Sequence, residues 1–180
     1  DILNNKLHAG PCNKLVRLSC FANGINYESG LNFGEDTLVN VRLLAIGISV
    51  SYFHKAFYHY ERDANPKSAS KQTSLDSIVQ REQMIASIRN VLPQSEYSKA
   101  IDNKLVPIAF TALKSNIYDK NEYLARYDRL ANLKWTDYSK SSPLPYRIII
   151  WSSCHLSYGV ARLLLAIKEL YGRFANLCKI

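Results

Sequence analysis

A polar run at residues 66–74 divides this chain into two parts whose apolar patterns differ. Small polar and basic residues fill the run after Pro66, as in a surface loop. Beyond it, apolar residues recur at intervals of three and four, the period of an amphipathic helix. Before it, short alternating stretches interrupt the helical spacing and indicate strands. The chain therefore predicts an α/β part over residues 1–72 and a helical part over residues 73–180.

The first part has one clear helix. Gly34 breaks the chain before residues 35–46, where apolar positions follow helical spacing. Other stretches alternate between apolar and small residues or are rich in aromatic residues, which favours strands. These strand candidates are residues 25–27, 46–52 and 57–60.

The second part is punctuated by prolines that mark helix boundaries. Pro107 lies inside one predicted helix and is expected to kink or split it. The predicted helices are residues 75–91, 95–116, 121–133 and 146–174, the last broken near residues 152–157.

Bulk properties narrow the class of protein. A chain of 180 residues can bury a core without disulfides or metals. The net charge of +8 favours an anionic partner such as a nucleotide diphosphate, a lipid headgroup or nucleic acid. The 4 cysteines form no C-x-x-C pair, which is typical of reduced thiols in a cytoplasmic protein. Charges interrupt the apolar stretch 144–170, so no transmembrane helix is predicted.

Adjacent acids, Glu35 and Asp36, stand in the first turn of the predicted helix, directly after Gly34. Acids there can satisfy free backbone N–H groups and complement the helix dipole. The position also suits a general base, because a strand-to-helix junction at a sheet edge faces the crevice where α/β proteins bind ligands. Taken alone, the pair leaves both interpretations open.

Further motifs surround these acids in a fixed order along the chain. They are Asn13-Lys14-Leu15 with Arg17, Ile25-Asn26-Tyr27-Glu28-Ser29-Gly30, Gly34-Glu35-Asp36, Tyr58-His59-Tyr60 and a loop containing Ser68. This ordered set resembles the second half of bacterial family-2 glycosyltransferases. Position 12 is Cys, where the family often has Trp before Asn-Lys-Leu. The detailed acceptor-binding surface would therefore differ from that of the family, whereas Asn13-Lys14-Leu15 still matches.

The resemblance implies the acceptor-binding half of a GT-A, Rossmann-like fold, followed by a helical region. It implies inverting transfer of a sugar from a nucleotide-diphosphate donor to a glycan or lipid-linked acceptor hydroxyl, in surface polysaccharide or glycolipid synthesis. Asp36 would be the general base, and Glu35 would shape the acceptor site. Such an enzyme would be cytoplasmic or peripheral at the inner membrane of a bacterium.

The resemblance also implies a divalent metal, Mg or Mn, held mainly by a D-x-D motif. No D-x-D string occurs in this chain. We therefore expect that motif in a nucleotide-binding half that precedes residue 1, and no metal ligands here. The chain alone is expected to bind donor poorly and to be inactive.

The remaining candidates for substrate binding each have a structural alternative. Asn13 and Lys14 would order the acceptor site, or would form a solvated turn. His59 and Arg62 would reach the diphosphate, or would be exposed residues on and after a strand. Ser68 would belong to a loop that closes over the donor, or to a linker.

The competing function is a basic helical interaction or nucleic-acid-binding module without catalysis, suggested by the charge and by 12 tyrosines. Because no nucleic-acid motif accompanies them and the basic residues are scattered, we expect no nucleic-acid partner. Residues 146–174 would either lie on an anionic membrane surface or pack against the other helices. The oligomeric state is not predicted.

Overall fold

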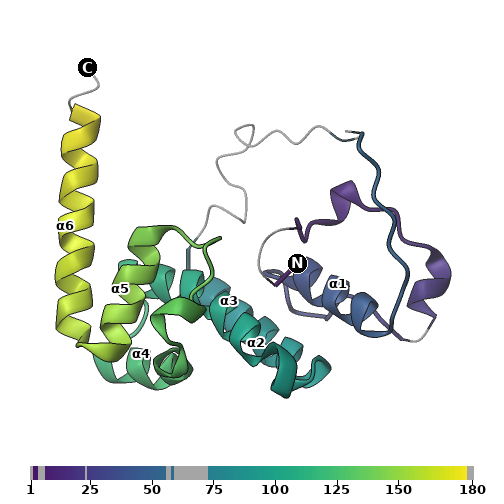
Figure 1. The fold of residues 1–180 in the computed structure, drawn as a ribbon, viewed down its shortest axis with the longest axis horizontal. Helices are drawn as coiled ribbons and strands as arrows, with labels where there is room; N and C mark the ends of the chain where they lie inside the picture. The colour runs from purple at the N-terminus through teal and green to yellow at the C-terminus, as the bar shows by residue number, and fades with distance from the viewer. Residues whose placement is uncertain (1, 4–6, 23, 56–57, 59–72, 178–180) are drawn as a thin grey trace. The chain divides into compact units, whose positions relative to one another are not determined.

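The structure, a computed structural model, describes residues 2–3, 7–22, 24–55, 58 and 73–177 (Figure 1). Every regular element among these residues is a helix. Contacts divide the chain into two compact units, Asp1–Ser98 and Lys99–Ile180. No helix in the described ranges is long and apolar enough to cross a membrane.

The first unit is built on α1 (Glu35–Ala45) and α2 (Leu75–Val91), which pack against each other. Two short 3-10 turns precede them, η1 (Pro11–Asn13) and η2 (Leu18–Phe21). The inner face of α1 buries Val39 and Leu43 against Ile25. This cluster holds the irregular segment after η2 against α1.

The predicted α/β class is wrong, because the described residues contain no strand. The structure therefore does not support the acceptor half of a GT-A, Rossmann-like fold. The alternating stretch 46–52 follows the end of α1, where Gly47 at a φ of 77° stops the helix. Its Val50 and Tyr52 are 69% and 74% exposed. A strand needs a neighbour for its backbone hydrogen bonds, and no described segment supplies one.

The other strand candidates do not form strands among the described residues either. Residues 25–27 are irregular, although Ile25 is buried. Its apolar side chain fills the cluster on α1 without any strand pairing. The candidate at 57–60 lies largely outside the described residues, and its one described member, Tyr58, is not in a strand.

The helical predictions are largely confirmed. α2 has the predicted bounds, and Ser74 begins it with a capping box in which the backbone N–H of Ser77 donates to Ser74 Oγ at 3.1 Å. α3 (Gln94–Lys114) continues through Pro107 and does not split there. The expected break at 152–157 separates α5 (Leu144–His155) from α6 (Tyr158–Leu177). The helix predicted over 121–133 is instead the shorter α4 (Lys120–Arg126) followed by the 3-10 turn η4 (Asp128–Asn132).

Aromatic residues build much of the core of the second unit. The ring of Phe110 on α3 stacks on Tyr146 of α5, with centroids 3.6 Å apart. Tyr123 and Tyr127, around the end of α4, are each 1% exposed. α5 also packs against α6 and η4. The second unit is therefore a helical cluster around α3 and α5.

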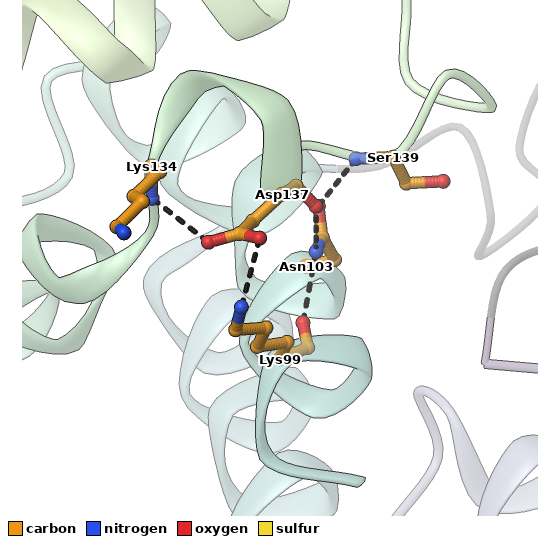
Figure 2. A network of polar contacts seen from close by, with 5 residues as sticks. All are labelled: Lys99, Asn103, Lys134, Asp137 and Ser139. Atoms are coloured by element: carbon orange, nitrogen blue, oxygen red, sulfur yellow. Dashed lines mark hydrogen bonds and ion pairs between the residues drawn. The ribbon is translucent and has the colours of Figure 1, made fainter.

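A polar network fastens the turn η5 (Trp135–Asp137) to α3 (Figure 2). The Asn103 amide donates to the carbonyl oxygens of Asp137 and Lys99, each at 2.8 Å, and its oxygen accepts from the Ser139 N–H at 2.7 Å. The Asp137 carboxylate accepts from Lys99 Nζ at 2.9 Å and from the Lys134 N–H at 3.0 Å. One buried amide thus pairs with two backbone groups at and after η5, the Asp137 carbonyl and the Ser139 N–H.

Candidate functional site

The N-terminus of α1 is positioned by α2. Gly34 is the N-cap residue, with a φ of 92° and a ψ of 2°. Two residues earlier, the Asn32 N–H donates to Gln80 Oε1 on α2 at 2.7 Å. A Cβ added to Gly34 would lie 3.0 Å from two side-chain atoms of Met84, also on α2. This close approach and the left-handed backbone both require glycine before the first turn of α1.

The segment from His8 to Lys14 is tied to the same helix. Asn40 Nδ2 donates to the Ala9 carbonyl oxygen and to the Asp36 carbonyl oxygen, each at 2.7 Å. Because Asn40 lies one turn after Asp36, this bridge brings the segment against the start of α1. The Gly10 N–H donates to His8 Nδ1 at 3.0 Å, so the His8 ring folds back over Gly10.

Within this segment, the Lys14 ammonium group is fixed by three acceptors. Nζ donates to the His8 and Gly10 carbonyl oxygens and to Asn13 Oδ1, the last two at 2.8 Å. Burial lowers the pKa of Lys14, and the negative charge of Asp36 opposes that shift. The fixed cation therefore interacts electrostatically with the carboxylate of Asp36.

Tyr27 is a further residue that the two acids influence. Arg42 of α1 forms a 2.7 Å ion pair with Glu28, and its guanidinium donates to the Asn26 carbonyl oxygen at 3.3 Å. These contacts hold the residues on both sides of Tyr27. Burial raises the pKa of Tyr27, and the charges of Asp36 and Glu35 raise it further. The phenol is thus within electrostatic range of both carboxylates.

The two acids are half-buried side by side in the first turn of α1. Burial raises the pKa of Asp36, and the charges of Lys14 and His8 partly offset the shift. Burial also raises the pKa of Glu35, against stabilisation of its carboxylate by the Glu35 and Gly34 backbone amides. Since Gly34 occupies the N-cap, neither acid is the capping residue. Both are less acidic than ordinary carboxyl groups.

The predicted site residues therefore separate into two sets. Asn13, Lys14, Glu35 and Asp36 lie together around the start of α1. The others, His59, Arg62 and Ser68, lie outside the described residues.

Three residues near the two acids, Asn40, Tyr27 and His8, were not predicted as part of the site from the sequence. Asn40 could have been found because it lies four residues after Asp36 on the same helix. Tyr27 was included only as part of a strand and of the motif at residues 25–30, and His8 was not selected. No sequence signal singles out His8.

The cluster can supply a proton acceptor beside a fixed cation, with its carboxylates partly open to solvent. No group of three or more His, Cys, Asp or Glu side chains that could hold a metal ion gathers in the described parts of the chain.

Comparisons with known proteins add no further constraint: no protein-family model, curated protein or solved structure matches this chain. The ordered motifs and the geometry of the first unit are therefore what any assignment of function rests on.

Proposed function

We propose that the protein containing this chain is a glycosyltransferase that moves a sugar from a nucleotide-diphosphate donor to an acceptor hydroxyl, with Asp36 as general base. One observation carries the proposal. Asn13-Lys14 and Glu35-Asp36 are distant in sequence, yet the Lys14 ammonium, which Asn13 helps to hold, interacts electrostatically with the half-buried carboxylate of Asp36. A chance resemblance gives no reason for the two motifs to converge there.

The proposed reaction is a single in-line displacement. The acceptor oxygen attacks the anomeric carbon of the donor sugar, and the bond from that carbon to the diphosphate oxygen breaks. The electron pair of the broken bond leaves with the diphosphate. Asp36 takes the acceptor proton as the new bond forms. Because attack comes from the side opposite the leaving group, the anomeric configuration inverts.

The surroundings of Asp36 suit a base. Burial raises the pKa of Asp36, so its carboxylate binds a proton more strongly than an exposed one would. The charges of Lys14 and His8 oppose that shift and favour the ionised form before reaction. The three acceptors around Lys14 Nζ keep this cation in place.

The other residues would shape the acceptor site. Tyr27, which is 52% exposed, offers an aromatic ring and a hydroxyl group to an acceptor bound near Asp36. Glu35 offers a second carboxyl group whose raised pKa favours hydrogen bonding to a sugar hydroxyl. Asn13 orients Lys14 through its side-chain oxygen. Asn13 and Lys14 would therefore organise the site around the base.

The donor side is proposed to lie on residues outside this chain. The chain contains no D-x-D string, and its described residues form no metal cluster. A Mg or Mn ion that neutralises the leaving diphosphate would have to be held elsewhere in the protein. Donor binding and acceptor activation would then belong to different segments.

The test is the stereochemistry of transfer by the full-length protein. Uridine, guanosine and thymidine diphosphate sugars would be incubated with simple glycosides and with a lipid extract as acceptors. We expect nucleoside diphosphate release that depends on one donor, and a product whose anomeric proton shows inverted configuration by nuclear magnetic resonance. Retained configuration, or donor binding without transfer to any acceptor, would contradict the proposal.

A further inference from the structure

One face of α6 is apolar and exposed. Its large side chains recur at intervals of three and four residues, so they line one side of the helix. They range from 36% exposed at Val160 to 76% at Tyr171. The face consists of Val160, Leu163, Ile167, Leu170, Tyr171 and Phe174. Exposed single apolar residues are ordinary, but a continuous stripe marks an interaction surface.

A different side of α6 attaches the helix to its unit. Ala161 and Leu165 are 0% and 3% exposed. Arg162 Nη1 donates to the Leu113 carbonyl oxygen at the end of α3, at 2.7 Å. The Lys168 ammonium lies 5.7 Å from the centroid of the Phe110 ring. These contacts fix how α6 is turned, so the exposed face is a consequence of the packing.

The later turns of α6 extend past the N-terminal end of α5, and no other helix of the unit overlaps them in Figure 1. Leu170, Tyr171 and Phe174 are 53%, 76% and 64% exposed there. The apolar face therefore continues past the part of α6 that packs against its neighbours.

Charge is concentrated on the same unit. Residues 99–180 contain 13 Lys and Arg against 6 Asp and Glu, a balance of +7 out of the +8 of the whole chain. Within α6, the basic residues are Arg162, Lys168 and Arg173, and the only acid is Glu169. At 100° per residue, Lys168 and Arg173 fall on opposite flanks of the apolar stripe. Basic residues flanking an apolar face are typical of helices that lie on anionic bilayers.

We propose that α6 docks this protein on an anionic lipid bilayer, lying in the plane of the surface with its apolar face among the acyl chains. The exposed Arg173 would stand at the level of the headgroups. The proposal does not depend on the assignment of Asp36 as a base, because the two surfaces belong to different units.

A second copy of the chain fits the same face less well. If the stripe were a coiled-coil seam, its flanking positions would be Leu164, Ala166, Tyr171 and Arg173. These offer no pairs of opposite charge to specify a partner helix. Nucleic acid would match the charge but would leave the apolar side chains in water. An anionic bilayer satisfies both properties.

The experiment is cosedimentation of the chain with lipid vesicles at low and high salt. We expect binding to phosphatidylglycerol mixed with phosphatidylcholine, weakening as salt rises, and little binding to phosphatidylcholine alone. Leu163→Gln together with Ile167→Gln should lower the partition coefficient by about tenfold or more, since two apolar side chains no longer insert. Arg173→Glu should weaken binding only to the anionic vesicles.

A matched control replaces two exposed leucines on other helices, Leu44→Gln and Leu75→Gln, which are 41% and 54% exposed. This variant should bind vesicles as the wild type does. Equal binding by the α6 double variant and the wild type would overturn the proposal. So would self-association through α6 without vesicle binding, or binding only to a single-stranded oligonucleotide.

Discussion

Replacement of Gly34 by alanine tests how α2 fixes the start of α1. At a φ of 92°, an alanine side chain costs about 1–2 kcal/mol through its left-handed backbone. Its Cβ would also lie 3.0 Å from Met84 Cγ and Cε and 3.3 Å from Met84 Cβ. Because Met84 is only 6% exposed, its side chain has little room, and overpacking adds about 1–3 kcal/mol. The expected loss of stability is roughly 2–5 kcal/mol.

The assay is hydrogen exchange of the backbone amides of α1, which reports the free energy of opening in the first unit. The double variant Gly34→Ala/Met84→Ala separates the two costs, since it removes the contact and leaves the backbone strain. We expect the two substitutions to couple by about 1–2 kcal/mol, with the double variant more stable than the sum of the single effects predicts. A Gly34→Ala variant as stable as the wild type would refute the reasoning. Additive effects would refute the contact with Met84.

Other consequences concern buried polar groups and one acid. Asn103→Ala should destabilise the second unit by about 2–4 kcal/mol, because it leaves the Ser139 N–H and the Asp137 carbonyl without their hydrogen-bond partner. Tryptophan fluorescence during urea unfolding would measure the loss of stability. A neutral result would contradict the network in Figure 2. Tyr138→Phe should be neutral or stabilising by about 1 kcal/mol in the same assay, because the buried hydroxyl has no hydrogen-bond partner among the described residues. A large loss of stability would contradict this and indicate that the hydroxyl has a partner. Asp36→Asn should stabilise the first unit at neutral pH, since folding raises the pKa of Asp36 and its ionisation therefore costs stability. That gain in stability should vanish below the ordinary aspartate pKa, where the carboxyl group of Asp36 is protonated in both the folded and the unfolded state. Hydrogen exchange of α1 measured across pH tests this expectation. A gain in stability that grew as the pH fell would contradict it.

The helices were predictable because their signals are local. Ser74 caps α2, Pro93 follows its end, and apolar residues recur at helical spacing between them. The break between α5 and α6 was also visible, although α4 stops earlier than its periodicity suggests. These features depend on residues within one or two turns of each other, which a single sequence contains.

The strands were wrong because pairing is not local. Residues 46–52 alternate as a half-buried strand does, but alternation only describes two faces and cannot show that a neighbouring strand exists. Val50 and Tyr52 accordingly remain exposed beyond Gly47. Of the candidate site, only the residues within the ordered motifs could be selected from the sequence. Contacts such as Asn40 with Ala9 depend on how a loop folds back on a helix.

The turnover of the full-length protein carrying Asp36→Asn tests the central claim most directly. Asparagine keeps the size of the side chain but cannot accept the acceptor proton. The matched control is Asp128→Asn, the same change at an exposed aspartate in the first turn of η4, in the second unit. We predict that Asp36→Asn lowers the rate of transfer by about 10²–10⁴-fold with donor binding unchanged, and that Asp128→Asn transfers at the wild-type rate. Wild-type turnover by Asp36→Asn would contradict the assignment of Asp36 as the base.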